Sequence, residues 1–348
     1  MKKAIFAAVV LALAVLTIWF FTKKPAKPDN QAATTVQNQE QPAPEPKPQL
    51  AAAVNGSLVA PEVAAKRPIA VMVENHPDAR PQSGLTGADL VYEALAEGGI
   101  TRFMAVYQTG DVKNIGPVRS ARTYFAEIAD ELGAIYAHVG GNSDVLANIK
   151  QKLYKNIGNA DQFFDDGSYF HRISARPMPH NVYTSTAKLQ NLIGAYRFGD
   201  LAAYQNWQFN YEAVSPTSTA SNITIDFSLS QFLVNYRYDS KNNQYLRFLA
   251  GKPHTDLDTG KQIVAKDVIV QFVQTFPVKS DTPLSIGMTL TGTGKAYVFQ
   301  DGGVIIGTWK KTAGDRTRYF DANGREIKFN PGQVWVELVP TDRTVMWK

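Results

Sequence analysis

The feature that most constrains the fold is a change in the spacing of apolar residues near residue 217. Beyond this point short segments alternate apolar with polar residues, which is the period of a strand that buries one face. Segments 222–227 and 232–238 show the pattern, and Asp301-Gly302-Gly303 supplies a hairpin turn. Eight or nine such segments predict a β-rich C-terminal domain over 217–348, folded as a barrel or a sandwich.

The preceding part of the chain, residues 61–205, mixes both apolar periods. Apolar runs at 68–74 and 90–95 are rich in residues that favour strands and predict buried strands. Residues 120–132 follow helical spacing, with Ser120 as the expected N-cap. Strands and helices that alternate in this way predict a mixed α/β domain. The expected fold class is therefore α+β, an α/β domain followed by the β-rich domain.

The first 60 residues predict an anchor and a tether. Two lysines precede an apolar run from Ala4 to Phe21, which is long enough as a helix to span a bilayer core. We expect residues 1–24 to be an uncleaved signal anchor, with cleavage after the run as the alternative. Six prolines and almost no branched apolar residue follow, so residues 25–60 are expected to form a disordered linker.

The amino-acid composition limits where the protein can be located and which classes of partner it can bind. The chain has no cysteine, which excludes a disulfide scaffold, a thiol nucleophile, a thiolate zinc site and a lipid anchor on cysteine. Of the formal net charge of +5, six lysines against three acids place +3 in residues 1–60, so the folded part is nearly neutral and offers no reason to bind nucleic acid. We expect a single-pass cell-membrane protein with extracytoplasmic domains; a cytoplasmic-facing tail is the alternative.

Several sequence strings resemble the YerB-like family of bacterial envelope proteins. They are Arg67–Asn75, Arg80–Leu85, Ala88–Glu93, Glu97–Arg102, Gly116–Arg122, Arg176–Asn181, Gly307–Lys310 and Pro331–Trp335. The resemblance covers nearly everything from 67 to 348, and it implies a two-domain, membrane-tethered exported protein whose biochemical activity is unassigned. Many relatives look like lipoproteins with a lipid-modified cysteine. This chain has no cysteine, so we expect the apolar run at 4–21 to be its anchor instead.

Basic residues gather without acids in one stretch of the N-terminal half. From Gly167 to Gly199 there is no aspartate or glutamate. The planar guanidinium of arginine suits phosphate and carboxylate groups, and arginines near helix N-termini form sites for anions. The ligand-binding residues predicted on this basis are Arg102, Arg119, Arg122, Arg172, Arg176, His180 and Asn181.

Glu97 and His138 are the candidate acid–base residues. His138 ends a predicted strand before two glycines, a position that ligands favour in α/β sheets, and a satisfied semi-buried histidine is the alternative. Glu93 and Glu97 are candidates for proton transfer or a hard cation, but we favour a structural ion-pair network with the nearby arginines. No Gly-x-Ser-x-Gly, His-Glu-x-x-His or Walker motif is present, so whether the chain is an enzyme stays open.

No cofactor and no metal are expected. Asp165, Asp166, His171 and His180 fit no strong spacing rule for a metal site. The C-terminal tryptophans, including Trp309, are expected to pack in the core rather than form a glycan platform.

Together these features predict a protein that binds an anionic envelope glycopolymer or a lipid-linked phosphate through the arginine-rich face of its N-terminal domain. Two other classes remain open. One is an envelope enzyme of phosphoryl or glycosyl chemistry, and the other is a non-catalytic scaffold whose β domain binds a protein or a glycan. Unpaired arginines in an open cleft would favour a ligand site, whereas arginines buried against carboxylates would favour the scaffold.

Overall fold

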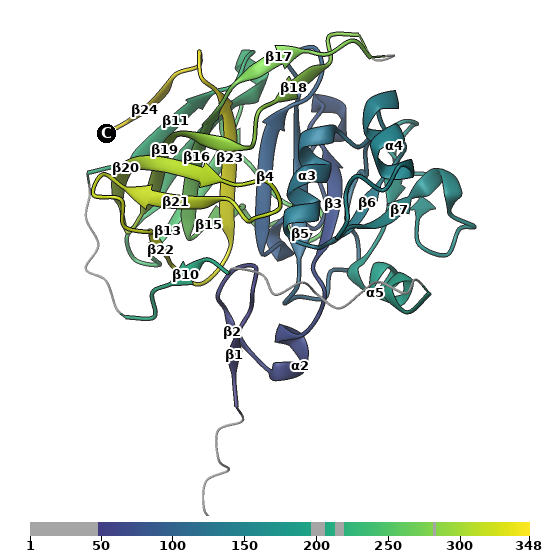
Figure 1. The fold of residues 1–348 in the computed structure, drawn as a ribbon, viewed down its shortest axis with the longest axis horizontal. Helices are drawn as coiled ribbons and strands as arrows, with labels where there is room; N and C mark the ends of the chain where they lie inside the picture. The colour runs from purple at the N-terminus through teal and green to yellow at the C-terminus, as the bar shows by residue number, and fades with distance from the viewer. Residues whose placement is uncertain (1–47, 196–205, 213–218, 281–282) are drawn as a thin grey trace, which may run out of the picture. The chain divides into compact units, whose positions relative to one another are not determined.

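The computed structural model describes residues 48–195, 206–212, 219–280 and 283–348 (Figure 1). The predicted anchor at 1–24 lies outside these residues, and among those described no helix is long and apolar enough to cross a membrane. Residues 50–59, expected to belong to the linker, form the hairpin of β1 (Leu50–Ala51) and β2 (Leu58–Val59). The expected disorder does not extend to this segment, because Val54 is buried in the core and its N–H donates to Gln108.

A ten-stranded mixed sheet forms the centre of the described fold. Its strands in spatial order are β21 (Arg318–Asp321), β20 (Gly303–Lys311), β19 (Gly292–Gln300), β16 (Asp267–Val273), β23 (Val334–Pro340), β4 (Leu90–Leu95), β5 (Thr101–Tyr107), β3 (Ile69–Glu74), β6 (Ile135–His138) and β7 (Gly158–Asp161). The sheet takes strands from both sides of the boundary expected at 205–217, because β23 pairs in parallel with β4. Strand residues far outnumber helical residues in the described part of the chain, which is a mostly β fold with a large mixed sheet.

A second sheet faces the C-terminal half of the first. It contains β14 (Lys252–Pro253), β13 (Gln244–Leu249), β12 (Leu233–Asp239), β11 (Asn222–Asp226) and β24 (Val345–Trp347), with β15 (Val264–Ala265) paired to β13. Alternate residues of β11, β12 and β13 are buried, as the period-two pattern predicts. The two sheets touch where the Trp347 ring packs edge-on against Tyr297, with ring centroids 4.9 Å apart.

The α-helices described beside the large sheet come from the N-terminal half of the chain. They are α3 (Thr123–Glu131), α4 (Ser143–Lys150) and α5 (Thr186–Ala195), and a short α2 (Pro61–Ala64) precedes β3. Figure 1 shows α3 across one face of the sheet and α4 and α5 at its β6–β7 end. The helix α3 begins at Thr123 with Arg122 as N-cap, so the expected cap at Ser120 is wrong. The preceding residues stay extended because Val118 bridges to β3.

Smaller two-stranded pairings complete the described structure. They are β8 (His171–Arg172) with β9 (Val182–Tyr183), β10 (Gln208–Phe209) with β22 (Lys328–Phe329), and β17 (Thr275–Pro277) with β18 (Ile286–Met288). Four short 3-10 turns are described as well: η1 (Pro77–Ala79), η2 (Leu85–Gly87), η3 (Gln162–Phe164) and η4 (Ser230–Phe232).

A buried ionic network joins strands from the two halves of the chain. Arg247 of β13 is fully buried and pairs with Glu93 of β4 and, at 3.4 Å, with Glu337 of β23. The Tyr236 hydroxyl donates to Glu337 over 2.5 Å, and the Arg247 guanidinium lies over the Trp335 ring. Glu93 is thus neutralised by an arginine from the C-terminal half, and the core is continuous across both halves.

Candidate functional site

Three chain segments meet at the carboxyl end of β3. The first is the end of the strand itself with the 3-10 turn η1, where Glu74 is the last strand residue. The second is segment 116–122, whose Val118 bridges to Val73. The third is segment 172–181, which leads into β9 and is tied to the second by the Val118 N–H donating to the Val182 carbonyl over 2.7 Å. Residues far apart in the sequence are therefore brought to one edge of the sheet.

Glu74 is the centre of the site that these segments build. Its carboxylate is almost fully buried, and its two oxygens face two different partners. One oxygen lies 2.8 Å from Nε of Arg119, and the other lies 2.8 Å from Nδ1 of His180. The Arg119 side chain is 24% exposed and that of His180 is 12% exposed, so both reach the surface from a buried carboxylate.

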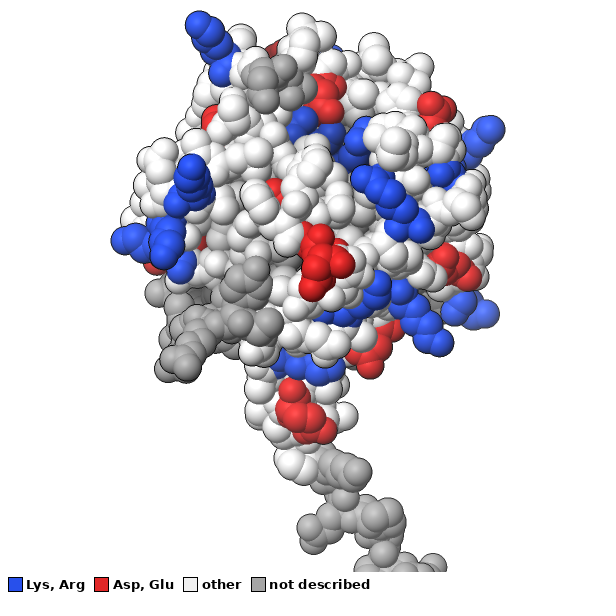
Figure 2. All heavy atoms as spheres, turned by 90° about the vertical axis from the view of Figure 1, so that its right-hand side faces the viewer, with Lys and Arg blue, Asp and Glu red and all other residues white. Residues whose placement is uncertain are grey.

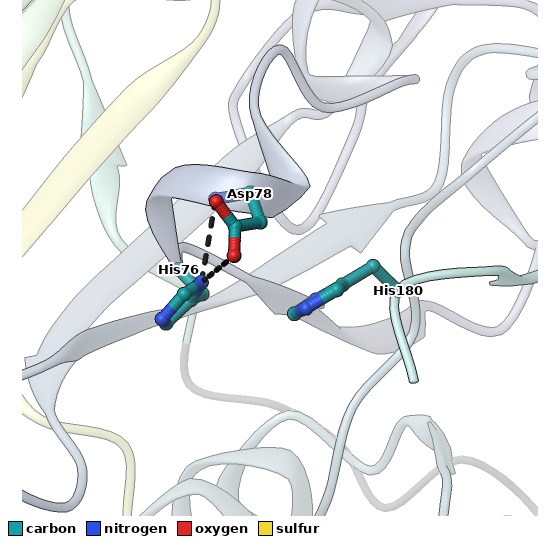
Figure 3. Close-up of side chains that lie close together, drawn as sticks. All are labelled: His76, Asp78 and His180. Carbon is teal, nitrogen blue, oxygen red and sulfur yellow. Dashed lines mark hydrogen bonds and ion pairs between the residues drawn. The ribbon is translucent and has the colours of Figure 1, made fainter. Parts of the chain in front are cut away.

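His76 and Asp78 lie beside His180 at the turn η1 (Figure 3). The His76 and His180 rings are stacked, with centroids 5.4 Å apart and planes at 19°. His76 Nδ1 accepts the Asp78 N–H over 3.3 Å and lies 3.5 Å from the Asp78 carboxylate. Both side chains are more exposed than His180, at 37% for His76 and 74% for Asp78. The arrangement places two imidazoles and a carboxylate at the surface.

Arginines of the acid-free segment hold the loop against η1. Arg176 donates to the carbonyl oxygens of Asp78 and Pro81, over 3.2 and 2.6 Å. Arg172, which is exposed, donates to the Asn181 side-chain oxygen over 2.7 Å. Arg119 is thus the arginine that pairs with the buried Glu74 carboxylate, while Arg176 holds the loop at η1 and Arg172 lies further along that loop. The Glu74 cluster is hereafter Glu74, His76, Asp78, Arg119, Arg176 and His180.

Glu97, Arg102 and Arg122 form a second, separate group, the Glu97 triad. Glu97 in the β4–β5 turn pairs with Arg102 at 2.6 Å and also with Arg122, and both arginine side chains are only 4% exposed. Burial alone raises the pKa of Glu97, but the charges of the two arginines outweigh it and hold the pKa below its ordinary value. Burial, reinforced by the charge of Arg102, lowers the pKa of Arg122. This geometry is the structural ion-pair network that the sequence analysis favours over a catalytic role for Glu97.

His138 lies in the interior, at the end of β6, where the neighbouring Val139 N–H donates to the Arg119 carbonyl over 3.0 Å. It is fully buried, with Nδ1 2.8 Å from the Gly140 carbonyl and Nε2 2.8 Å from the Asn159 side chain. Gly140 has a φ of 55°, in the left-handed region, and its N–H donates to Asp161. Gly140 therefore provides the backbone conformation that the turn requires. His138 is buried with both ring nitrogens near hydrogen-bonding partners, which agrees with the alternative in which this histidine has a structural role.

The structure thus divides most of the predicted site residues between two groups. Arg119, Arg176 and His180 belong to the Glu74 cluster, with Arg172 and Asn181 on the same loop, whereas Arg102, Arg122 and Glu97 form the triad. Segment 119–122 links the two groups, since Arg102 donates to the Ser120 carbonyl over 3.0 Å. Sequence reasoning missed Glu74, His76 and Asp78 as site residues; their position at the end of a buried strand and in the turn that follows it was the available signal.

The residues considered as metal ligands at 165–171 have structural partners. Asp165 accepts the N–H groups of Tyr169 and Phe170, over 3.0 and 2.9 Å, and Asp166 accepts the N–H of Ser168. Burial, with a smaller contribution from the Lys188 charge, lowers the pKa of His171. The two carboxylates shape the turn that contains them.

The charge on the face that includes α5 and β7 is mixed. Figure 2 shows lysines and arginines there interspersed with acidic residues rather than merged into one continuous basic patch. A surface of this kind favours recognition at a discrete site over binding along a long polyanion.

Comparison with known proteins agrees with the motifs. Residues 55–198 match the N-terminal domain, and residues 223–336 the C-terminal domain, of a family described as "Protein of unknown function (DUF3048)". The chain is 33% identical over 293 residues to the "Putative lipoprotein YerB" of Bacillus subtilis (strain 168), which covers 84% of this chain and 86% of that protein. The crystal structure of YerB from Bacillus subtilis matches with a TM-score of 0.76 and 32% identity, over 85% of this chain and 99% of that one. The resemblance to YerB-like proteins is confirmed.

Proposed function

The chain belongs to the DUF3048 family, and from this premise we propose that it is a bacterial envelope protein that binds an anionic, phosphorylated envelope ligand at the Glu74 cluster. Two observations support this location. The relative from Bacillus subtilis carries a lipoprotein name, and the apolar run at 4–21 is long enough to anchor this cysteine-free chain as a single-pass helix. The folded domains lie on the extracytoplasmic side.

The observation that carries the proposed ligand is the environment of Arg119. One edge of its guanidinium faces the buried Glu74 carboxylate, and about a quarter of the side chain remains exposed. Phosphate oxygens accept several hydrogen bonds from a guanidinium, and a partly buried arginine gives stronger ones than a fully solvated arginine.

The neighbouring charges favour an anion at this place. Arg119 and Arg176 of the cluster, together with Arg172 on the same loop, carry three positive charges, against two negative charges on Glu74 and Asp78. The loop that supplies Arg172 and Arg176 contains no acid, so an anionic ligand meets a net positive rim.

The test is a series of thermal unfolding measurements on the full-length chain in detergent, with EDTA present. Inorganic phosphate, pyrophosphate and glycerol 3-phosphate are compared with acetate and chloride at equal ionic strength. A ligand at a hundred times its dissociation constant stabilises the fold by about 2.7 kcal/mol, which is a readily measured rise in midpoint. We expect the phosphorylated compounds to raise the midpoint and acetate not to do so. No rise with any phosphorylated compound would overturn the proposal.

A second candidate function, the non-catalytic scaffold, is favoured by the Glu97 triad. There one carboxylate pairs with two arginines whose side chains are each only 4% exposed, which leaves almost no guanidinium surface that a ligand could reach. In this case the phosphate series gives no shift. A cysteine introduced at the exposed Asp111 then serves for crosslinking in cells, because the chain has no cysteine of its own. A single crosslinked protein partner is the result that this function predicts.

A further inference from the structure

We infer that His76, Asp78 and His180 form a binding site for a divalent transition-metal ion such as Zn²⁺. The inference concerns the same surface cluster as the proposed function, but it does not depend on an anionic ligand. One ligand atom from each of the three residues lies within 4.8 Å of the other two. These are two imidazole nitrogens and one carboxylate oxygen, a set that suits Zn²⁺ and its first-row neighbours better than Mg²⁺ or Ca²⁺.

Half of the coordination geometry is already close to what the ion requires. Zinc–nitrogen distances of about 2.0–2.1 Å place two ligand atoms of a tetrahedral ion about 3.3 Å apart. His76 Nδ1 and the nearer Asp78 oxygen are 3.5 Å apart, so these two atoms can chelate with little movement. Nδ1 of His76 accepts the Asp78 N–H, which means that it carries a lone pair on this side of the ring. Both residues are exposed enough to adjust their rotamers.

His180 supplies the third ligand in a form that metal sites commonly use. Its Nδ1 lies 2.8 Å from the buried Glu74 carboxylate, to which it donates. This leaves Nε2 of the same ring as the atom with a free lone pair. A carboxylate that fixes the tautomer and orientation of a ligating histidine is a recurrent outer partner in zinc sites. Glu74 is itself held by Arg119, so the His180 ring has a fixed support.

Three protein ligands leave a coordination position open. Sites with three protein ligands and an open position are those in which zinc binds water or a substrate oxygen, in contrast to closed structural sites with four. Arg119 belongs to the same cluster through its pairing with Glu74, the carboxylate that holds His180. An oxygen anion bound to the ion would therefore find a guanidinium within the same cluster, which connects the metal to the ligand class proposed above.

The test is calorimetric titration of the full-length, EDTA-stripped chain with Zn²⁺ in a buffer without phosphate. We expect saturable binding of one ion per chain. His76→Ala and Asp78→Asn change exposed side chains and are expected to weaken binding by about tenfold or more. His171→Ala removes another partly buried histidine of the same region and serves as the matched control, with unchanged affinity.

Thermal unfolding in EDTA checks that each variant is folded, and wild-type midpoints are expected for His76→Ala and Asp78→Asn. Absence of saturable zinc binding to the wild-type chain would overturn the inference, as would wild-type affinity in both variants. The phosphate series is run in EDTA and the zinc titration without phosphate. Failure of one proposal is therefore distinguishable from failure of the other.

Discussion

The guanidinium of Arg247 holds the two halves of the protein together, and its removal has a predictable cost. The side chain is fully buried, pairs with Glu93 and Glu337, and lies 4.2 Å from the Trp335 ring centroid. Arg247→Met keeps most of the side-chain volume but leaves the buried carboxyl groups of Glu93 and Glu337 without a cation. Breaking a buried ion pair from one side costs about 3–5 kcal/mol, and we expect the free energy of unfolding to fall by this amount.

The assay is urea unfolding of the full-length chain in detergent, followed by tryptophan fluorescence. Arg237→Met is the matched control, because Arg237 is exposed on the neighbouring strand β12, and its cost is expected to stay within about 0.5 kcal/mol. The double variant Arg247→Met/Glu93→Gln is expected to recover part of the loss, since it removes one of the stranded charges. A loss below about 1 kcal/mol in Arg247→Met would refute the reasoning.

Two further variants test the buried charges. Burial raises the pKa of Glu337 from an ordinary value of 4.5 to about 8, although the charge of Arg247 opposes the shift. Between these two pH values the folded state therefore holds one more proton than the unfolded state. The free energy of unfolding should therefore fall as pH rises through this window, by up to about 1.4 kcal/mol per pH unit. Urea titrations at several pH values measure this slope, and Glu337→Gln should flatten it. An unaltered slope in the variant would contradict the assignment of the extra proton to Glu337. Glu97→Gln leaves Arg102 and Arg122 buried without an anion, so it should lower the free energy of unfolding by about 2–3 kcal/mol. The partial exposure of Glu97 keeps the effect below that of a fully buried pair. An unchanged unfolding midpoint would show that water solvates both guanidiniums in place of the carboxylate.

The positions of individual strands could be predicted from the sequence, but the strands that pair with one another could not. The run at 90–95 and the alternation at 222–227 and 232–238 correspond closely to β4, β11 and β12. Apolar spacing records which face of a segment is buried, but it carries no information on which distant segment lies beside it. The parallel pairing of β23 with β4, which carries one sheet across both halves, had no local signal.

The arginines of the site were predictable as a group, but their carboxylate partners were not. An acid-free stretch between 167 and 199 is visible in the sequence, whereas the pairing of Arg119 with Glu74 depends on three segments meeting at one strand end. The pairing of Glu93 with Arg247, 154 residues away, depends on the same kind of long-range contact. Sequence reasoning therefore predicted the pairing of Glu97 with nearby arginines, but it could not predict the long-range pairs of Glu74 with Arg119 and of Glu93 with Arg247.

The most direct measurement of the central claim is the affinity of the full-length chain for glycerol 3-phosphate, in EDTA, with and without Arg119. Arg119→Gln removes the partly exposed guanidinium, and the loss of a charge-assisted hydrogen bond of about 1.5–3 kcal/mol corresponds to at least a tenfold rise in the dissociation constant. Arg325→Gln, at a guanidinium that is 76% exposed on a distant hairpin, is the matched control. The account predicts a weakening of at least tenfold in Arg119→Gln and none in Arg325→Gln. Equal affinity in the wild-type and Arg119→Gln chains would contradict it.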